Sequence, residues 1–229
     1  MTFASDYLAY AAGAVFAILP IVNPLSAVPL VMTAGAHLSL EERQRQIRRA
    51  CTYSFVLMAG FLLAGSLIMN FFGISIPGMR IAGGMIVAFL GFRMLFPAAP
   101  ESPELQRQME HKTDIAFTPL AMPGLSGPGA FAIIMSLSSQ ASARQGADKI
   151  VDFLGVLTGI VVVALVSWLV LRAGERLQRV LGATGMVAMA RLMGFLMVCI
   201  GVQFLIDGLS AILRDPTFWV GLADAVHQP

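Results

Sequence analysis

Three polar side chains lie inside two long apolar stretches that prolines interrupt. Asn23 and Ser26 belong to the first stretch and Ser126 to the second. A proline removes a backbone donor and bends a helix, so the backbone groups around it lose their helical partners. Free N–H groups at the start of a half-helix suit a carboxylate, and free C=O groups at its end suit an ammonium group or a cation. The pattern therefore predicts recognition of a small zwitterion at mid-membrane depth.

We expect the substrate to be held around these two interruptions, where small and polar residues let the backbone approach a ligand. The candidate substrate-binding residues are Asn23, Pro24, Ser26, Gly124, Ser126, Gly127 and Gly129. The alternative for Asn23 and Ser126 is that each satisfies the freed backbone of its own kink. The two interpretations carry equal weight, and one side chain could serve both purposes.

The composition is that of a membrane protein. Of the 229 residues 57% are hydrophobic and only 12% are charged, with a net charge of +2. Soluble domains carry about 25% charged residues. Six apolar stretches cover about 7–36, 50–72, 79–96, 115–137, 153–171 and 187–213. Because a spanning helix needs roughly 20 residues, we predict an all-α integral membrane protein with six transmembrane helices, the first and fourth broken by prolines.

An internal repeat relates the two halves of the chain. Pro20, Pro24 and Pro29 match Pro119, Pro123 and Pro128 at a constant offset. Each half contains three crossings, so the second half must be inverted in the membrane, as in many secondary transporters. We predict repeats over 1–97 and 115–229 joined by a cytoplasmic loop over 98–114. The alternative is that prolines are simply common in spanning helices.

Two arginines and four glycines also correspond between the halves. Arg80 and Arg191 begin the third and sixth stretches, where they either snorkel to the membrane interface or take a gating or ion-pair role. Gly84 and Gly91 have the same spacing as Gly194 and Gly201. Small residues permit close helix packing, and we expect the helix pairs to rock about these glycines.

Basic residues predict the orientation. Arg43, Arg45, Arg48 and Arg49 are assigned to the first loop, and further basic residues fall in alternate loops. Basic loops stay in the cytoplasm, which places both termini in the periplasm. A rival topology with two re-entrant hairpins would move the arginines of the fifth loop outside. The segment before Tyr7 has no Lys or Arg, unlike a signal peptide.

Several classes of function are disfavoured. The sequence has no phosphate-binding loop, no H-E-x-x-H and no G-x-S-x-G, and its three histidines fall in expected loops or the tail. We predict no enzyme, no catalytic or metal site, no cofactor and no nucleic-acid partner. Cys51 and Cys199 are interpreted as buried apolar residues. Asp114 and Asp207 are assigned to interfaces, and no acidic residue is expected deep in a helix, which weakens the case for a proton relay. Sodium and a proton both remain open as the coupling ion.

Long motifs resemble the MarC family of bacterial inner-membrane proteins. The matching segments are Asn23-Pro24 with Pro29, 72–84, 91–97, 119–123, 127–129, 191–196 and 201–204. The resemblance covers nearly the whole chain. It implies a six-helix protein of the bacterial inner membrane, in a family that includes transporters of small neutral amino acids. Ser126 departs mildly from the threonine frequent before Gly-Pro-Gly in the family, and keeps the hydroxyl.

The functional hypothesis combines the residues with this resemblance. We expect a secondary transporter or exporter of small neutral amino acids or similar small solutes, working by alternating access in a lipid bilayer. The alternative is a non-transporting inner-membrane component in a stress response or a partner complex. The pair of broken helices argues against the alternative, because a scaffold does not need them.

Overall fold

The computed structural model describes residues 3–96, 114–216 and 218–219. Within these ranges the chain is helical and has no strand, as the sequence predicts. The loop expected over 98–114 lies outside the described residues except for Asp114. The elements are α1 (Phe3–Val22), α2 (Pro24–Ala34), α3 (Leu40–Phe72), α4 (Ile76–Leu95), the π-helical η1 (Ala116–Leu125), α6 (Pro128–Ser142), α7 (Ala147–Arg172) and α8 (Gly174–Leu213).

Five helical segments among the described residues are long and apolar enough to cross a membrane. They are Tyr7–Ala34, Leu40–Phe72, Ile76–Leu95, Asp148–Arg172 and Thr184–Leu213. The fourth stretch of the sequence is divided between η1, with 10 residues, and α6, with 15. Each is shorter than the roughly 20 residues that a straight crossing needs. By length and composition, the structure thus gives five spans where the sequence predicts six.

The second span begins earlier than expected. Ser39 caps α3 by accepting a hydrogen bond from the backbone N–H of Glu42 at 3.2 Å, and Glu41 and Glu42 complement the positive end of the helix dipole. The four arginines that the sequence assigns to the first loop therefore lie inside α3. The helix ends at Gly73, whose φ of 65° closes the last turn.

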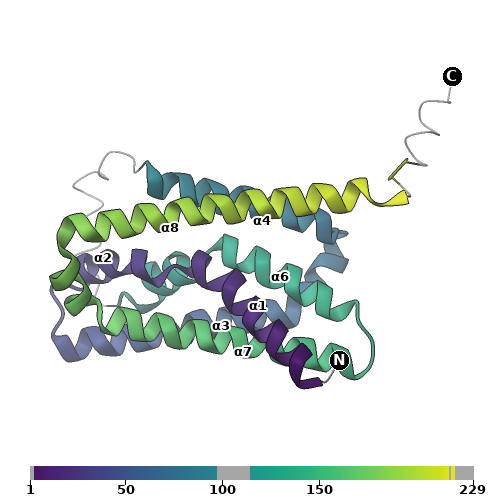
Figure 1. Cartoon of the computed structure of the whole chain (residues 1–229). Coiled ribbons are helices and arrows are strands. Elements are labelled where there is room, and N and C mark those ends of the chain that lie inside the picture. Colours follow the sequence, from purple (N-terminus) through teal and green to yellow (C-terminus); the bar gives the residue numbers. More distant parts are fainter. Residues whose placement is uncertain (1–2, 97–113, 217, 220–229) are drawn as a thin grey trace.

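The helices form three layers (Figure 1). Helices α4 and α8 lie side by side in one layer, α3 and α7 lie on the opposite side, and α1, α2 and α6 lie between them. The antiparallel α4 and α8 meet at paired glycines: a Cβ on Gly84 would lie 2.6 Å from the Gly201 carbonyl oxygen, and one on Gly91 would lie 2.6 Å from that of Gly194. The close packing expected of these four glycines is thus observed.

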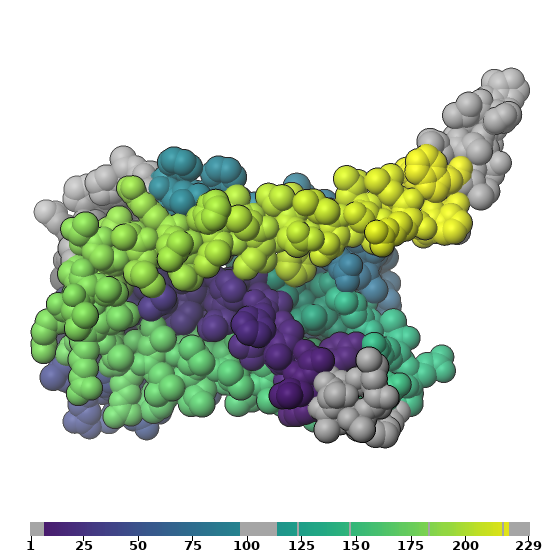
Figure 2. Space-filling model, viewed as in Figure 1, coloured from purple at the N-terminus to yellow at the C-terminus, as the bar shows by residue number. Residues whose placement is uncertain are grey.

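The outer surface of the bundle is apolar. Figure 2 shows α8 running along one whole face of the molecule, and this helix exposes Leu192, Phe195 and Ile206 by at least half. Other large exposed side chains lie on α1, α3, α4 and α7: Phe16, Leu63, Leu67, Phe89 and Leu165. Contiguous exposed apolar surface of this kind is lipid-facing in a membrane protein. Cys51 is buried as expected, whereas Cys199 lies exposed on α8, so that expectation was wrong.

Candidate functional site

Asn23 forms the first interruption, between α1 and α2. Its φ of 40° is left-handed, a conformation that Asn tolerates better than most residues. Its Oδ1 accepts a hydrogen bond from the Ser26 backbone N–H at 3.4 Å, while the Ser26 hydroxyl donates to the Asn23 carbonyl at 2.8 Å. Pro24 takes the first position of α2, where no donor is needed. The side chains thus satisfy the local backbone.

One donor of Asn23 has a weak partner. Its Nδ2 lies 3.6 Å from the Met94 sulfur of α4, and the residue is only 3% exposed. A thioether is a weak acceptor, so a carboxylate at this position would gain a stronger, charge-assisted hydrogen bond. The amide is therefore placed to recognise an anion once a ligand displaces the sulfur.

Ser126 marks the second interruption, between η1 and α6. Thr118 and Met122 have extended backbone angles within η1, so this segment is not a regular helix. Ser126 is fully buried, and both its N–H and its hydroxyl donate to the Ala121 carbonyl oxygen at 2.8 Å. Gly127 is the N-cap of α6 and has no side chain to cap it, and Pro128 follows at the first helical position. This hydroxyl, like that of Ser26, satisfies the backbone of its own kink.

The structure brings the two interruptions together. A methyl group placed on Gly124 would lie 3.6 Å from Cδ2 of Leu30 in α2. One placed on Gly129 would lie 3.3 Å from Cγ2 of Ile21, beside Asn23. Because Asn23 and Ser126 are both buried, the site is closed in this conformation.

Arg80 and Arg191 lie far apart along the α4–α8 pair. Gly84 faces Gly201 and Gly91 faces Gly194, so residue 80 lies opposite residue 205 and residue 191 opposite residue 94. Fourteen residues of helix, or about 20 Å at 1.5 Å per residue, separate the two arginines along the pair. Neither forms an ion pair with another described residue. Their gating role stays a prediction.

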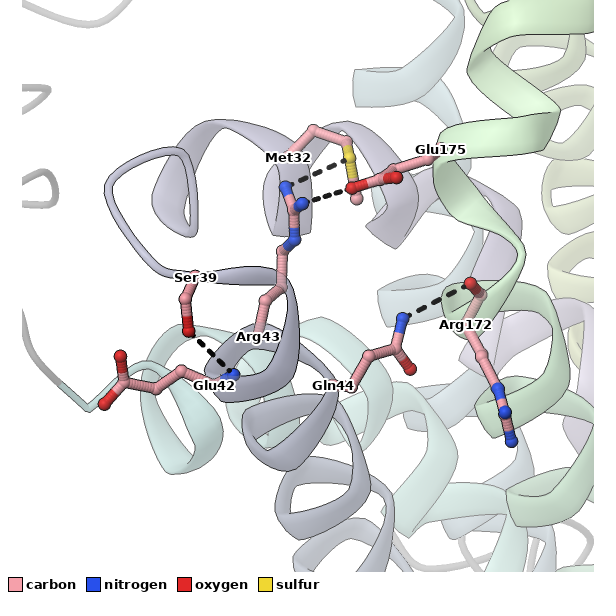
Figure 3. A network of polar contacts seen from close by, with 7 residues as sticks. All are labelled: Met32, Ser39, Glu42, Arg43, Gln44, Arg172 and Glu175. Carbon is pink, nitrogen blue, oxygen red and sulfur yellow. Dashed lines mark hydrogen bonds and ion pairs between the residues drawn. The ribbon is translucent and has the colours of Figure 1, made fainter.

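Ion pairs instead tie the helices at the two ends of α7. At its C-terminal end Arg43 of α3 pairs with Glu175 of α8 and approaches the Met32 sulfur at 3.8 Å (Figure 3). Beside it, the Gln44 amide donates to the Arg172 carbonyl at 3.4 Å, which satisfies an end of α7. Arg43 is mostly buried, with 13% of its side chain exposed. The contacts join the two halves of the chain at this end of the bundle.

A second pair lies at the other end of α7 and was missed by the sequence analysis. Asp152 is 1% exposed and pairs with Arg144 at 3.3 Å, and the Arg144 guanidinium lies 5.1 Å from the centre of the Tyr10 ring of α1. Asp152 is 20 residues, or about 30 Å, from Arg172. Asp152 is thus buried in the second turn of α7, near the N-terminal end of the helix, and the expectation that no acidic residue lies deep in a helix stays a prediction. Ionisable groups buried in a spanning helix are costly and are commonly functional.

Comparisons with known proteins agree with a membrane bundle. Residues 8–213 match the model of a family described as "MarC family integral membrane protein". Proteins named inner membrane protein MarC from Salmonella typhimurium and Escherichia coli O1:K1 are each 45% identical over 206 residues, and one from Citrobacter koseri is 45% identical over 210. Each match covers 86% of this chain and 92% of the relative. No solved structure matches. Among the described residues no cluster of His, Cys, Asp and Glu could hold a metal ion.

Proposed function

Because the chain belongs to the MarC family of integral membrane proteins, and is a multi-pass protein of the inner membrane, we propose that it transports small neutral amino acids or similar small solutes across that membrane. The observation that carries the proposal is the contact between two interrupted helices whose polar residues, Asn23 and Ser126, are both buried. Irregular backbone at membrane depth is tolerated where it is buried in protein or lines a water-filled cavity, and the cavity of the proposal is a substrate site between the two breaks.

The proposed topology is six crossings in two inverted repeats, with both termini in the periplasm. Two relations support it. The stretch α1–α2 packs on α7 as η1–α6 packs on α3, and α4 and α8 meet at equivalent glycines. In this topology η1 and α6 together make the fourth crossing, interrupted near Ser126. The resulting pseudo-two-fold axis relates the two breaks, as in transporters that bind substrate between repeats.

In the proposed mechanism a zwitterion binds between the breaks. The N-termini of α2 and α6 present positive dipole ends to the substrate carboxylate, and Asn23 Nδ2 donates to it in place of Met94. Carbonyl groups at the C-terminal ends of α1 and η1 receive the ammonium group. Pro24, Ser26, Gly124, Gly127 and Gly129 shape the cavity, and either sodium or a proton supplies the driving gradient.

Alternating access requires each end of the bundle to open in turn. We assign closure of one end to Arg43–Glu175 and closure of the other to Arg144 with Asp152 and Tyr10. Each cluster joins an element of the first half to an element of the second. Both are formed in the closed conformation, and the α4–α8 glycine contact lets the repeats rock against each other.

Variants at the first break test the binding role of the Asn23 amide. Asn23→Gly keeps the left-handed backbone accessible and removes the amide, so we expect a normally folded protein with at least tenfold less flux, about 1.4 kcal/mol of lost interaction. Asn23→Ala removes the amide and strains the backbone as well. The measurement is uptake and counterflow of labelled glycine, alanine and serine in proteoliposomes, with sodium and pH gradients varied separately.

Ser126→Ala should lower flux in the same assay, while Asn70→Ala and Ser210→Ala, outside the breaks, should not. No flux above empty liposomes from folded wild-type protein would remove amino acids as substrates. Normal flux in Asn23→Gly would remove the amide from the site.

A further inference from the structure

An apolar groove opens on the lipid-facing side of the bundle between α3 and α7. Its volume is about 300 Å³, and its lining combines one face of each helix. The lining residues are Arg48, Cys51, Thr52 and Phe55 of α3 with Val161, Ala164, Leu165 and Trp168 of α7. Spacings of three, four and seven residues put each set on a single helical face. The groove is therefore a continuous feature of the helix pair.

Arginines surround one end of this groove. A second hollow, lined by Glu41, Arg45, Arg48, Arg49, Thr52 and Tyr53, shares Arg48 and Thr52 with it. On the α7 side, the Arg172 guanidinium lies 5.1 Å from the centre of the Trp168 ring. Glu41 reaches Arg45 at 3.9 Å, but both side chains are largely exposed, so this pair neutralises little of the positive charge.

We propose that this groove binds an anionic phospholipid, with its phosphate at the arginines and an acyl chain along the groove. Charge complementarity identifies the occupant. Arg48, Arg49 and Arg172 are exposed at the end of the groove that faces the membrane surface. The lining toward the membrane interior is almost wholly apolar. A lipid supplies both chemistries in one molecule. Basic pockets between spanning helices are typical sites for such head groups.

The proposed site has a structural consequence. Arg48 and Arg172 lie on different helices, one from each half of the chain, near the Gln44–Arg172 contact. A phosphate bridging them would stabilise that end of the bundle without adding a protein contact. This inference rests on the fold and is independent of the transport proposal.

Binding is tested on the purified full-length chain in detergent by native mass spectrometry, with phosphatidylglycerol and phosphatidylcholine as probes. We expect tighter binding of phosphatidylglycerol. Each arginine near a membrane surface contributes about fivefold in affinity, so Arg48→Gln with Arg172→Gln should weaken binding about 25-fold. Arg93→Gln, at an exposed arginine on α4 away from the groove, is the control and should change little.

Ala164→Trp tests the acyl chain separately, because Ala164 lines the groove and not the arginine hollow, so the change fills the groove without altering the charge. We expect it to weaken phosphatidylglycerol binding, and we expect inorganic phosphate not to compete. Equal binding of the two lipids, or an equal effect of Arg93→Gln and the double variant, would overturn the proposal. Full binding in Ala164→Trp, or displacement by phosphate, would overturn it too, because the arginines would then attract anions without a groove.

Discussion

Gly201→Leu is expected to abolish the folded protein, because α4 and α8 meet there backbone to backbone. A Cβ on Gly201 would lie 2.5 Å from the Ala88 nitrogen and 2.6 Å from the Gly84 carbonyl oxygen. Neither atom is the end of a flexible side chain, so the helices must separate. Even Gly201→Ala should cost about 1–3 kcal/mol, the usual range for overpacking. The measurement is the thermal unfolding midpoint in detergent, with the monodisperse fraction for the leucine variant.

Gly60→Ala is the matched control for the glycine contact between α4 and α8. Gly60 lies within α3, and a Cβ there meets no atom within 4 Å. Alanine is favoured over glycine in a helix by about 1 kcal/mol, so this change should leave stability unchanged or raise it slightly. The same gain would apply to Gly201→Ala if the helices did not touch. Equal thermal unfolding midpoints for Gly201→Ala and Gly60→Ala would therefore contradict the close contact between α4 and α8.

The lengths of the apolar stretches predicted most of the helices. They failed to predict where a helix begins with charged residues. The end of the second stretch and the whole third stretch lie close to where the sequence places them. The start of α3 was placed about ten residues late, because its first three turns carry four arginines and two glutamates. Capping by Ser39 was the local signal of the true start. In the first stretch the left-handed residue is Asn23, beside Pro24, whereas Pro20 and Pro29 lie inside α1 and α2. In the fourth stretch the extended angles are at Thr118 and Met122, each directly before a proline.

The sequence predicted which residues form the candidate site, but it did not predict which atoms they contact. Asn23 and Ser126 stand out in the sequence because polar residues beside prolines are conspicuous in apolar stretches. Which atoms they contact depends on helix packing between the two halves. Asp152 was missed because the apolar stretch begins one residue after it. The available signal was Gly146: a helix beginning there carries Asp152 into its second turn, within reach of Arg144.

Arg144→Gln is expected to have the second large effect, because it removes the cation that faces the buried Asp152 carboxylate. The variant should lower the stability of the closed conformation by about 1–3 kcal/mol. This loss is smaller than the ~3–5 kcal/mol of a fully buried pair, because 48% of the Arg144 side chain is exposed to screening by water. Adding Asp152→Asn removes the buried charge, so the double variant should recover part of the unfolding midpoint. Lys149→Gln, exposed at the same end, should have little effect.

A reporter cysteine separates opening of this end from general loss of stability. In a background with Cys51→Ala and Cys199→Ala, Ser126→Cys places a thiol at a fully buried position in the second break. Arg144→Gln should expose this thiol to a membrane-impermeant maleimide added on the Arg144 side, and Arg43→Gln should expose it only from the other side. Each guanidinium holds one end closed, so the two labelling patterns should be opposite. Labelling from both sides in both variants would mean that the ion pairs hold the bundle together as a whole and do not act as separate gates.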